Sequence, residues 1–156
     1  AAACVFFLLV GAVGIYVRQV HKTGWFGGLA FALAFIGSAT TFAHEWGQVF
    51  FLHDLATIAP EGLNALVDDR EGLNLYLIEV FLALVPFMLG WWLFAISMLM
   101  ARVFNPLGPI LLIGGFIAVP ILAATLPDLW GFVVGNTIIG AGWVILGLEL
   151  AKSETA

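Results

Sequence analysis

Long apolar runs are the feature of this sequence that most restricts its fold. They are separated by polar or helix-breaking residues and span residues 1–17, 25–52, 73–101, 110–126 and 129–150. A helix of about 17–25 apolar residues can cross the hydrocarbon core of a bilayer. None of the runs alternates like a membrane β-strand, so helices must satisfy the backbone hydrogen bonds there. We therefore predict one all-α domain over residues 1–156, a polytopic membrane helical bundle with about five transmembrane helices.

The composition agrees with a membrane protein. Apolar residues make up 63% of the chain and charged residues only 10%, whereas soluble domains average about 45–50% and about 25%. The net charge of −5 comes mostly from residues 54–72, where five acidic residues stand against Arg70 alone. Cys4 is the only cysteine, which excludes a disulfide within the chain, and the few basic residues argue against a nucleic-acid partner.

The basic residues predict the orientation of the chain. If the apolar runs alternate in direction, Arg70 lies alone on one side and four basic residues lie on the other: Arg18, Lys22, Arg102 and Lys152. Because cytoplasmic loops are rich in Lys and Arg, we expect these four in the cytoplasm and residues 54–72 outside. The sequence starts without Met inside an apolar run, so a preceding span or a removed signal stays open.

The outer loop contains one helix signal. Pro60 suits the first helical position, and Leu63, Leu66 and Val67 follow at i, i+3 and i+4 spacing. This pattern predicts a short helix lying on the outer surface, although an ordered polar loop fits the residues equally well.

Polar residues inside the apolar runs are the candidate functional residues. His44, Glu45 and Gln48 lie in the outer half of the second run. Glu79 lies about one and a half turns into the third run, and Asn136 lies about two turns into the fifth. Because polar groups within a span normally face the bundle interior, we predict that these five side chains form one outer-half cluster that binds a proton or ligand.

Small residues share helix faces with this cluster. Three stripes at spacings of four, three and four combine small and polar residues: Gly37, Thr41, His44 and Gln48; Glu79, Ala83, Pro86 and Gly90; and Asn136, Gly140, Trp143 and Gly147. Small residues let membrane helices approach closely, and the sequence leaves open whether the contacts are within the bundle or with other subunits.

The predicted cluster combines two carboxyl groups with one imidazole. A buried carboxylate must find a cation or become protonated, and His44 can neutralise only one of Glu45 and Glu79. The excess carboxyl group leaves room for a proton, a cation or the polar head of a ligand. The alternative is that these groups bond one another near the outer interface, where water completes their hydrogen bonds.

The histidine positions limit the possible cofactors. His53 lies on the opposite side of the same helix as His44, and His21 lies in the cytoplasmic loop, so haem held by two histidines of this chain is not expected. A single-ligand metal site at His44, for a tetrapyrrole such as a chlorophyll-type pigment or a shared haem, is the remaining option. The sequence has no phosphate loop, nucleophile elbow, HExxH or paired CxxC, so we assign no catalytic residue.

The stretch LGWWLFAISMLMARVFNPLGPILLIGGFIAVPILA, together with AHEWGQ before an acidic APEG loop, resembles uncharacterised multi-span bacterial membrane proteins of the domain-of-unknown-function kind. The resemblance covers residues 25–150 and implies a bacterial inner-membrane bundle with a span missing at its N-terminus here. It carries over no functional residue.

Three functions fit these observations. The leading hypothesis is a non-catalytic accessory or binding subunit of a membrane assembly, in contact with membrane lipid and with other subunits or a second copy. The second is a small proton-coupled carrier that uses Glu45, Glu79 and His44. The third is a pigment- or haem-binding subunit that uses His44 alone.

Overall fold

The computed structural model describes residues 2–63, 75–127 and 129–152, and these residues contain helices and no strand. The elements are α1 (Ala2–Gly47), the π-helix η1 (Gln48–Leu52), α2 (His53–Ile58), α4 (Leu75–Ala101), α5 (Leu107–Thr125) and α6 (Trp130–Lys152). Four to five of these helices are long and apolar enough to cross a membrane, depending on whether α1 counts once or twice. The predicted all-α class and its agreement with an integral membrane protein are confirmed.

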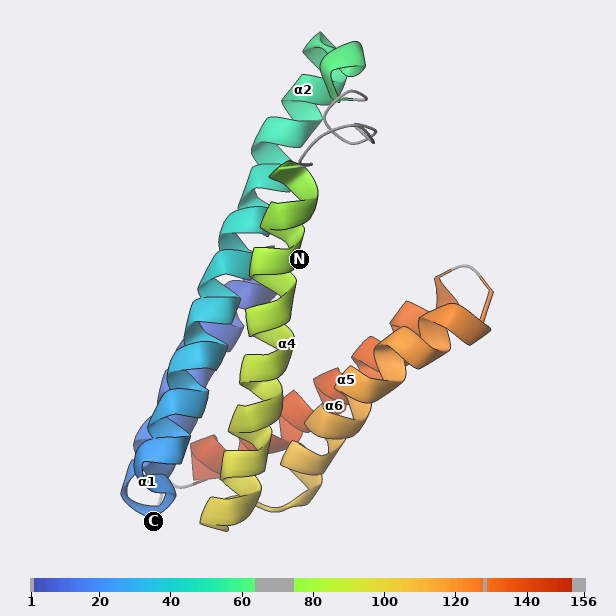
Figure 1. The fold of residues 1–156 in the computed structure, drawn as a ribbon. Coiled ribbons are helices and arrows are strands. Elements are labelled where there is room, and N and C mark those ends of the chain that lie inside the picture. The colour runs from blue at the N-terminus through green and yellow to red at the C-terminus, as the bar shows by residue number, and fades with distance from the viewer. Residues whose placement is uncertain (1, 64–74, 128, 153–156) are drawn as a thin grey trace.

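Helix α1 folds back on itself at Gly24, so that it forms two antiparallel arms (Figure 1). Gly24 has φ 55° and ψ −153°, a backbone conformation that is essentially restricted to glycine. The predicted break between the apolar runs 1–17 and 25–52 is therefore confirmed. The first helix was expected to end at residue 17, but it continues to this turn because Arg18 and Gln19 find hydrogen-bond partners on α6 and α4.

The other boundaries lie close to those expected. The second arm of α1 continues through η1 into α2, so this helix passes residue 52 and ends at Ile58. Residues 60–63 are helical, and the amide of Leu63 donates to the carbonyl oxygen of Ala59 at 3.1 Å. The remainder of the predicted surface helix, with Leu66, Val67 and the acidic residues 68–71, lies outside the described residues.

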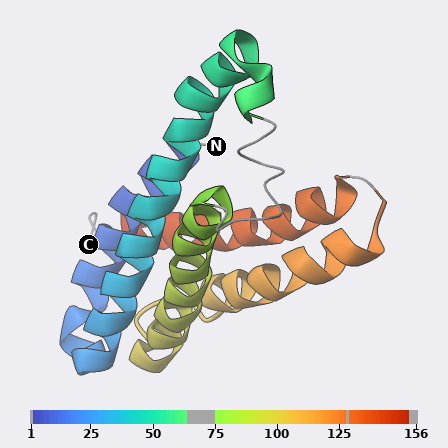
Figure 2. The same ribbon diagram turned by 45° about the horizontal axis from the view of Figure 1, so that its top comes forward.

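The helices form two groups that diverge from one end. Both arms of α1 lie beside α4, and α5 and α6 form a separate hairpin that leans away from them (Figures 1 and 2). The groups meet near Arg18, whose Nη1 donates to the carbonyl oxygen of Glu149 on α6 at 2.6 Å. The distance between the hairpin and α1 therefore grows toward the opposite end of the bundle.

Glycines allow the close contacts inside each group. A methyl group at Gly37 of α1 would overlap the backbone of Pro86 and Phe87, and one at Gly90 of α4 would overlap the backbone of Ala34. Gly131 and Gly135 of α6, spaced as GxxxG, similarly face the backbone of α5. The sequence left open whether the small residues make contacts within the bundle or with other subunits. These glycines make contacts within the chain.

The core of the bundle centres on Trp91 of α4, which is fully buried. Its Nε1 donates to Ser38 Oγ at 2.9 Å, and Ser38 Oγ donates to the carbonyl oxygen of Ala34 at 2.8 Å. The indole also meets Trp143 of α6 edge to face, with ring centroids 4.3 Å apart. Trp91 thus connects α1, α4 and α6 through one side chain.

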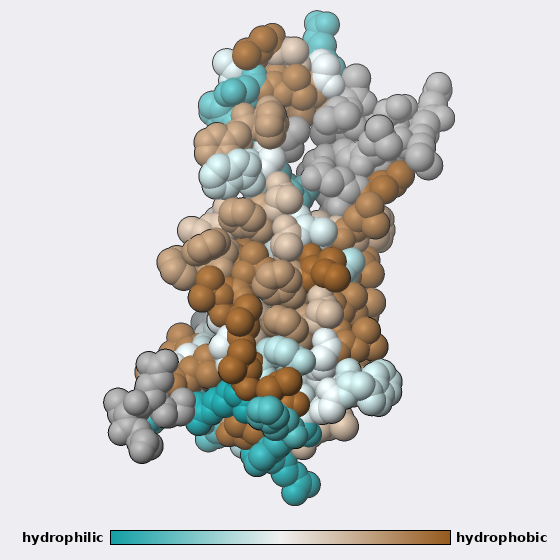
Figure 3. All heavy atoms as spheres, turned by 90° about the vertical axis from the view of Figure 1, so that its left-hand side faces the viewer, coloured by the Kyte–Doolittle hydropathy of each residue, from teal (hydrophilic) through white to brown (hydrophobic). Residues whose placement is uncertain are grey.

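Apolar side chains cover much of the outer surface. The face in Figure 3 is mostly brown in its middle part and has teal atoms near both ends. Large side chains point outward, including Phe7, which is 70% exposed, and Trp25, which is 81% exposed. An apolar exterior of this extent suits contact with lipid rather than water.

Candidate functional site

The polar stripe on the second arm of α1 begins against α4. Thr41 Oγ1 donates to the carbonyl oxygen of Ala83 at 3.2 Å, one turn below His44. That carbonyl is next to the carbonyl of Leu82, which has no helical donor because Pro86 lacks an N–H. Hydroxyl groups commonly satisfy carbonyl oxygens near such positions in membrane helices. The face predicted for Gly37, Thr41 and the residues above them is confirmed for its lower half.

His44 and Gln48 form the polar pair at the upper end of this stripe. Both side chains are half-buried, and the Gln48 Nε2 and His44 Nε2 atoms are 2.7 Å apart. The Gln48 amide and the His44 imidazole therefore form one hydrogen-bonded polar pair at this level of α1.

A π-helical turn starts at the same place. The five residues Gln48–Leu52 form η1, which continues α1 without a break. π-Helical turns are rare and commonly occur at functional sites, because the wider turn displaces side chains from regular helical positions. The apolar sequence around Gln48 gave no sign of this turn.

Glu45 and Glu79 were expected to face each other across α1 and α4. Glu45 is half-buried and forms no hydrogen bond or ion pair with any residue that the structure describes. Glu79 lies in α4, but its side chain lies outside the described residues. Their pairing stays a prediction.

Asn136 does not join the group around His44. It lies on α6, which with α5 forms the hairpin that leans away from α1 (Figure 1). Its side chain is exposed, and its Nδ2 donates to the carbonyl oxygen of Phe132 in its own helix at 2.8 Å. Trp143, on the same stripe nearer the joined end, does reach α4 through Trp91. The predicted face is therefore correct near Trp143, whereas the side-chain hydrogen bond of Asn136 stays within α6.

The described residues define limits for metal or cofactor binding. No group of three or more His, Cys, Asp and Glu side chains suitable for a metal ion occurs among them. His53 lies 3.6 Å from Asp54 on an exposed part of α2, separate from His44. A tetrapyrrole metal at His44 Nε2 would have to replace the hydrogen bond between His44 and Gln48.

A second polar group, which the sequence reasoning missed, joins the helices at the opposite end. The carboxylate oxygens of Glu149 accept from the backbone N–H of Asn105 at 2.9 and 3.2 Å, and Asn105 Oδ1 accepts from the amide of Leu107. The Arg18 guanidinium lies 5.4 Å from the ring centroid of Phe104. These contacts fix the connection between α4 and α5 against α1 and α6. The sequence signal for this group was the position of Arg18, Asn105 and Glu149 at or near the ends of apolar runs.

Helix α6 also has glycines that meet no neighbour. Gly140 and Gly147 have open space where a side chain would start, whereas Gly131, Gly135 and Gly142 face α5. With Asn136, the two unused glycines lie on one stripe of α6, which also carries Trp143, the side chain that packs against Trp91 of α4. We call this stripe, Asn136, Gly140 and Gly147, the open face of α6.

Comparison of the chain with protein-family models, with curated proteins and with solved structures found no match. Its function is therefore inferred from its own residues and contacts.

Proposed function

We propose that this protein is a non-catalytic subunit of a membrane assembly and that the open face of α6 packs against a transmembrane helix of another subunit. The observation that carries this proposal is Asn136, a polar side chain exposed on a helix that is apolar enough to span a membrane. The side-chain nitrogen Nδ2 of Asn136 bonds within α6, but the side-chain oxygen Oδ1 accepts no hydrogen bond from the described residues. Because lipid offers no donor, a partner helix is the environment that satisfies this oxygen.

The glycines on the same stripe support a helix as the partner. Small residues are enriched where membrane helices meet, because they allow the backbones to approach closely. Gly131, Gly135 and Gly142 show this use within the chain, where each faces the backbone of α5. Gly140 and Gly147 offer the same property beside Asn136 and remain unused within the chain.

The polar pair on α1 gives the subunit a second feature, a binding surface in its outer half. His44 and Gln48 are half-buried and bonded to each other, and Glu45 adjoins them without a partner among the described residues. This combination suits the polar head of a ligand or a polar residue of a neighbouring subunit.

The orientation follows from the basic residues. We propose five spans in a bacterial cytoplasmic membrane, with the two arms of α1 as separate spans and the end that carries Arg18, Lys22, Arg102 and Lys152 in the cytoplasm. Residues 54–72 then face outward. The bacterial location rests on the resemblance described above.

The assembly is tested by purification from membranes at native expression level. Wild-type protein is expected to elute as a complex larger than the monomer, and Gly140→Leu is expected to release it because the side chain fills the open face. Gly114→Leu is the matched control, since Gly114 of α5 also has open space around it but has no polar neighbour on its stripe. A wild-type particle that is strictly monomeric and free of partners would contradict the proposal.

A proton-coupled carrier is the second candidate, because Glu45 is a half-buried carboxyl group without a partner among the described residues. Proton flux into liposomes that contain the purified chain tests it. The carrier function predicts that Glu45→Gln abolishes the flux and that Thr40→Ala leaves it unchanged. Equal flux in the wild-type and Glu45→Gln proteins would remove this candidate.

A further inference from the structure

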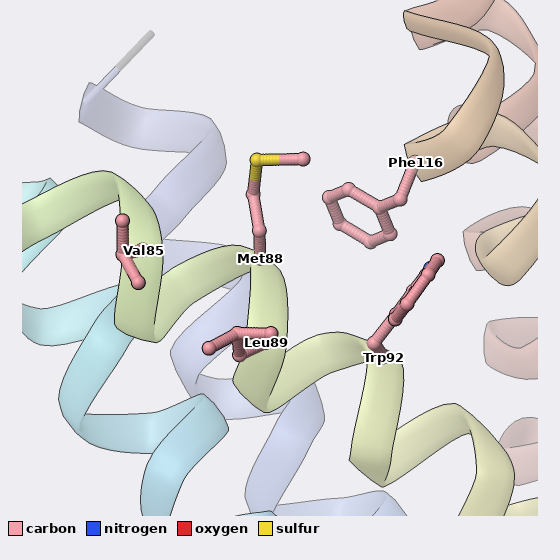
Figure 4. A pocket seen from close by; sticks show the side chains of 5 residues that line it. All are labelled: Val85, Met88, Leu89, Trp92 and Phe116. Carbon is pink, nitrogen blue, oxygen red and sulfur yellow. The ribbon is translucent and has the colours of Figure 1, made fainter. Parts of the chain in front are cut away.

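An apolar hollow lies between α4 and α5, where the two helices begin to separate. Its volume is about 280 Å³, and it is lined by Val85, Met88, Leu89, Trp92 and Phe116 (Figure 4). The first four residues share one face of α4, and the Phe116 ring reaches toward Met88 and Trp92 from α5. The lining of this hollow is almost entirely apolar, so water gains little hydrogen bonding there.

The same face of α4 leads to a second hollow at the end of the helix. Leu99 lies seven residues after Trp92, which is two helical turns along the same face at about 3.6 residues per turn. Leu99 lines a hollow of about 350 Å³ together with Arg102, Phe104 and Pro106. One side of α4 thus passes from an apolar hollow to a hollow that carries a cation.

Arg102 has two unusual properties. Its side chain is exposed, and its guanidinium group forms no hydrogen bond or ion pair with any residue that the structure describes. Its φ is 53°, so it ends α4 in the left-handed conformation that usually selects glycine or asparagine. A non-glycine residue in this conformation carries a backbone cost, which a function of its side chain would justify.

We propose that the face of α4 from Val85 to Arg102 binds an anionic phospholipid, with its phosphate at Arg102 and one acyl chain in the apolar hollow. Arg102 comes ten residues after Trp92, a rise of about 15 Å along a helix at about 1.5 Å per residue. That rise is half of the hydrocarbon thickness of about 30 Å. With Arg102 at the headgroups, Trp92 lies near the middle of the bilayer, where acyl chains of that leaflet end.

The charge and the apolar lining select the ligand together. A free phosphate could bind Arg102 but would leave the hollow at Trp92 empty, and a zwitterionic lipid would fill the hollow without a net charge for Arg102. An anionic phospholipid satisfies both parts of the site. This inference is independent of the proposed assembly, because it concerns the isolated chain in a bilayer.

Quenching of Trp92 fluorescence by brominated lipids tests the site. The purified chain is placed in vesicles that contain phosphatidylglycerol or phosphatidylcholine with brominated acyl chains, and the emission of a Trp92→Phe variant is subtracted. Near a membrane surface one Arg favours anionic lipid by about fivefold, so Trp92 is expected to prefer brominated phosphatidylglycerol by about that factor. Arg102→Gln is expected to bring the preference close to one.

Two further variants and one competitor make the result specific. Lys22→Gln removes an exposed cation at the same end of the bundle and is expected to keep the preference. Val85→Phe fills the hollow and is expected to lower the quenching of Trp92 by brominated phosphatidylglycerol while helicity is unchanged. Equal quenching by both lipids in the wild-type protein would overturn the proposal. Loss of the preference on adding inorganic phosphate would also overturn it, because it would show that a free anion occupies Arg102.

Discussion

Single residues hold the bundle together where its helix groups meet. Trp91 is the clearest case, because it has no exposed surface and contacts three helices. Its indole N–H needs an acceptor inside a membrane, and Ser38 Oγ is that acceptor. Ser38 in turn donates to its own helix, so the pair leaves no donor unsatisfied.

Removing the acceptor at Ser38 should destabilise the protein. We expect Ser38→Ala to lower the free energy of unfolding by about 1 kcal/mol, since membrane hydrogen bonds between helices average about 0.6 and reach about 1.7 kcal/mol. Unfolding in mixed micelles of rising SDS content measures this change. Thr40→Ala, which removes a hydroxyl bonded only within its own helix, is the control. The cost of Ser38→Ala is then measured again in a Trp91→Phe background, where the indole N–H is absent. If Ser38→Ala lowers the free energy of unfolding by the same amount in both backgrounds, Ser38 and Trp91 are not coupled.

At the scale of the elements, the turn inside α1 depends on one glycine. Gly24→Ala places a Cβ at φ 55° and ψ −153°, where residues other than glycine cost about 1–3 kcal/mol. The same loss is expected in the free energy of unfolding by SDS. Gly11→Ala serves as the control, because Gly11 lies within the helix with open space around it. If Gly24→Ala lowers the free energy of unfolding no more than Gly11→Ala does, a side chain at residue 24 does not strain the turn.

The contact between α1 and α4 predicts a different pair of sensitive glycines. Gly37→Ala and Gly90→Ala each force a methyl group into the backbone of the facing helix, so a loss of about 1–3 kcal/mol is expected from overpacking. Overpacking is also expected to push α1 and α4 apart. Slower disulfide formation between engineered cysteines on the two helices would report this movement. Unchanged stability and unchanged disulfide formation in both variants would show that the two helices do not pack at these glycines.

The sequence predicted the helices better than the distances between them. The breaks at Gly24 and at residues 105–109 were predictable because glycine and proline act on the local backbone. The continuation of the first helix through Gln19 was not, because its amide donates to Ser97, which lies 78 residues away. The same limit applies to Asn136: periodicity defines a helix face, but packing against other helices determines what that face meets, and Asn136 bonds within its own helix.

At the scale of the whole molecule, the orientation across the membrane can be measured directly. In a Cys4→Ala background, a membrane-impermeant maleimide is expected to label Asp54→Cys in intact cells. Lys22→Cys is expected to react only after the membrane is permeabilised, because the basic residues near it favour the cytoplasm. The reverse labelling pattern would invert the orientation.

The joined end of the molecule explains why the other end is open. Arg18, Asn105 and Glu149 tie α1, α6 and the connection before α5 together, and the hairpin leans away from there (Figure 1). The open face of α6 and the hollow beside Trp92 both follow from this divergence. A partner helix and lipid are thus expected to complete a surface that the chain leaves incomplete.

Photo-crosslinking from α6 in native membranes tests the central claim most directly. A benzophenone attached to Gly140→Cys in the Cys4→Ala background should form an adduct of one defined mass with another membrane subunit. The same probe on Gly114→Cys of α5 should form none, since that glycine has equal open space but lies outside the open face of α6. The absence of an adduct from position 140, or equal adducts from both positions, would contradict the claim that this face binds a partner helix.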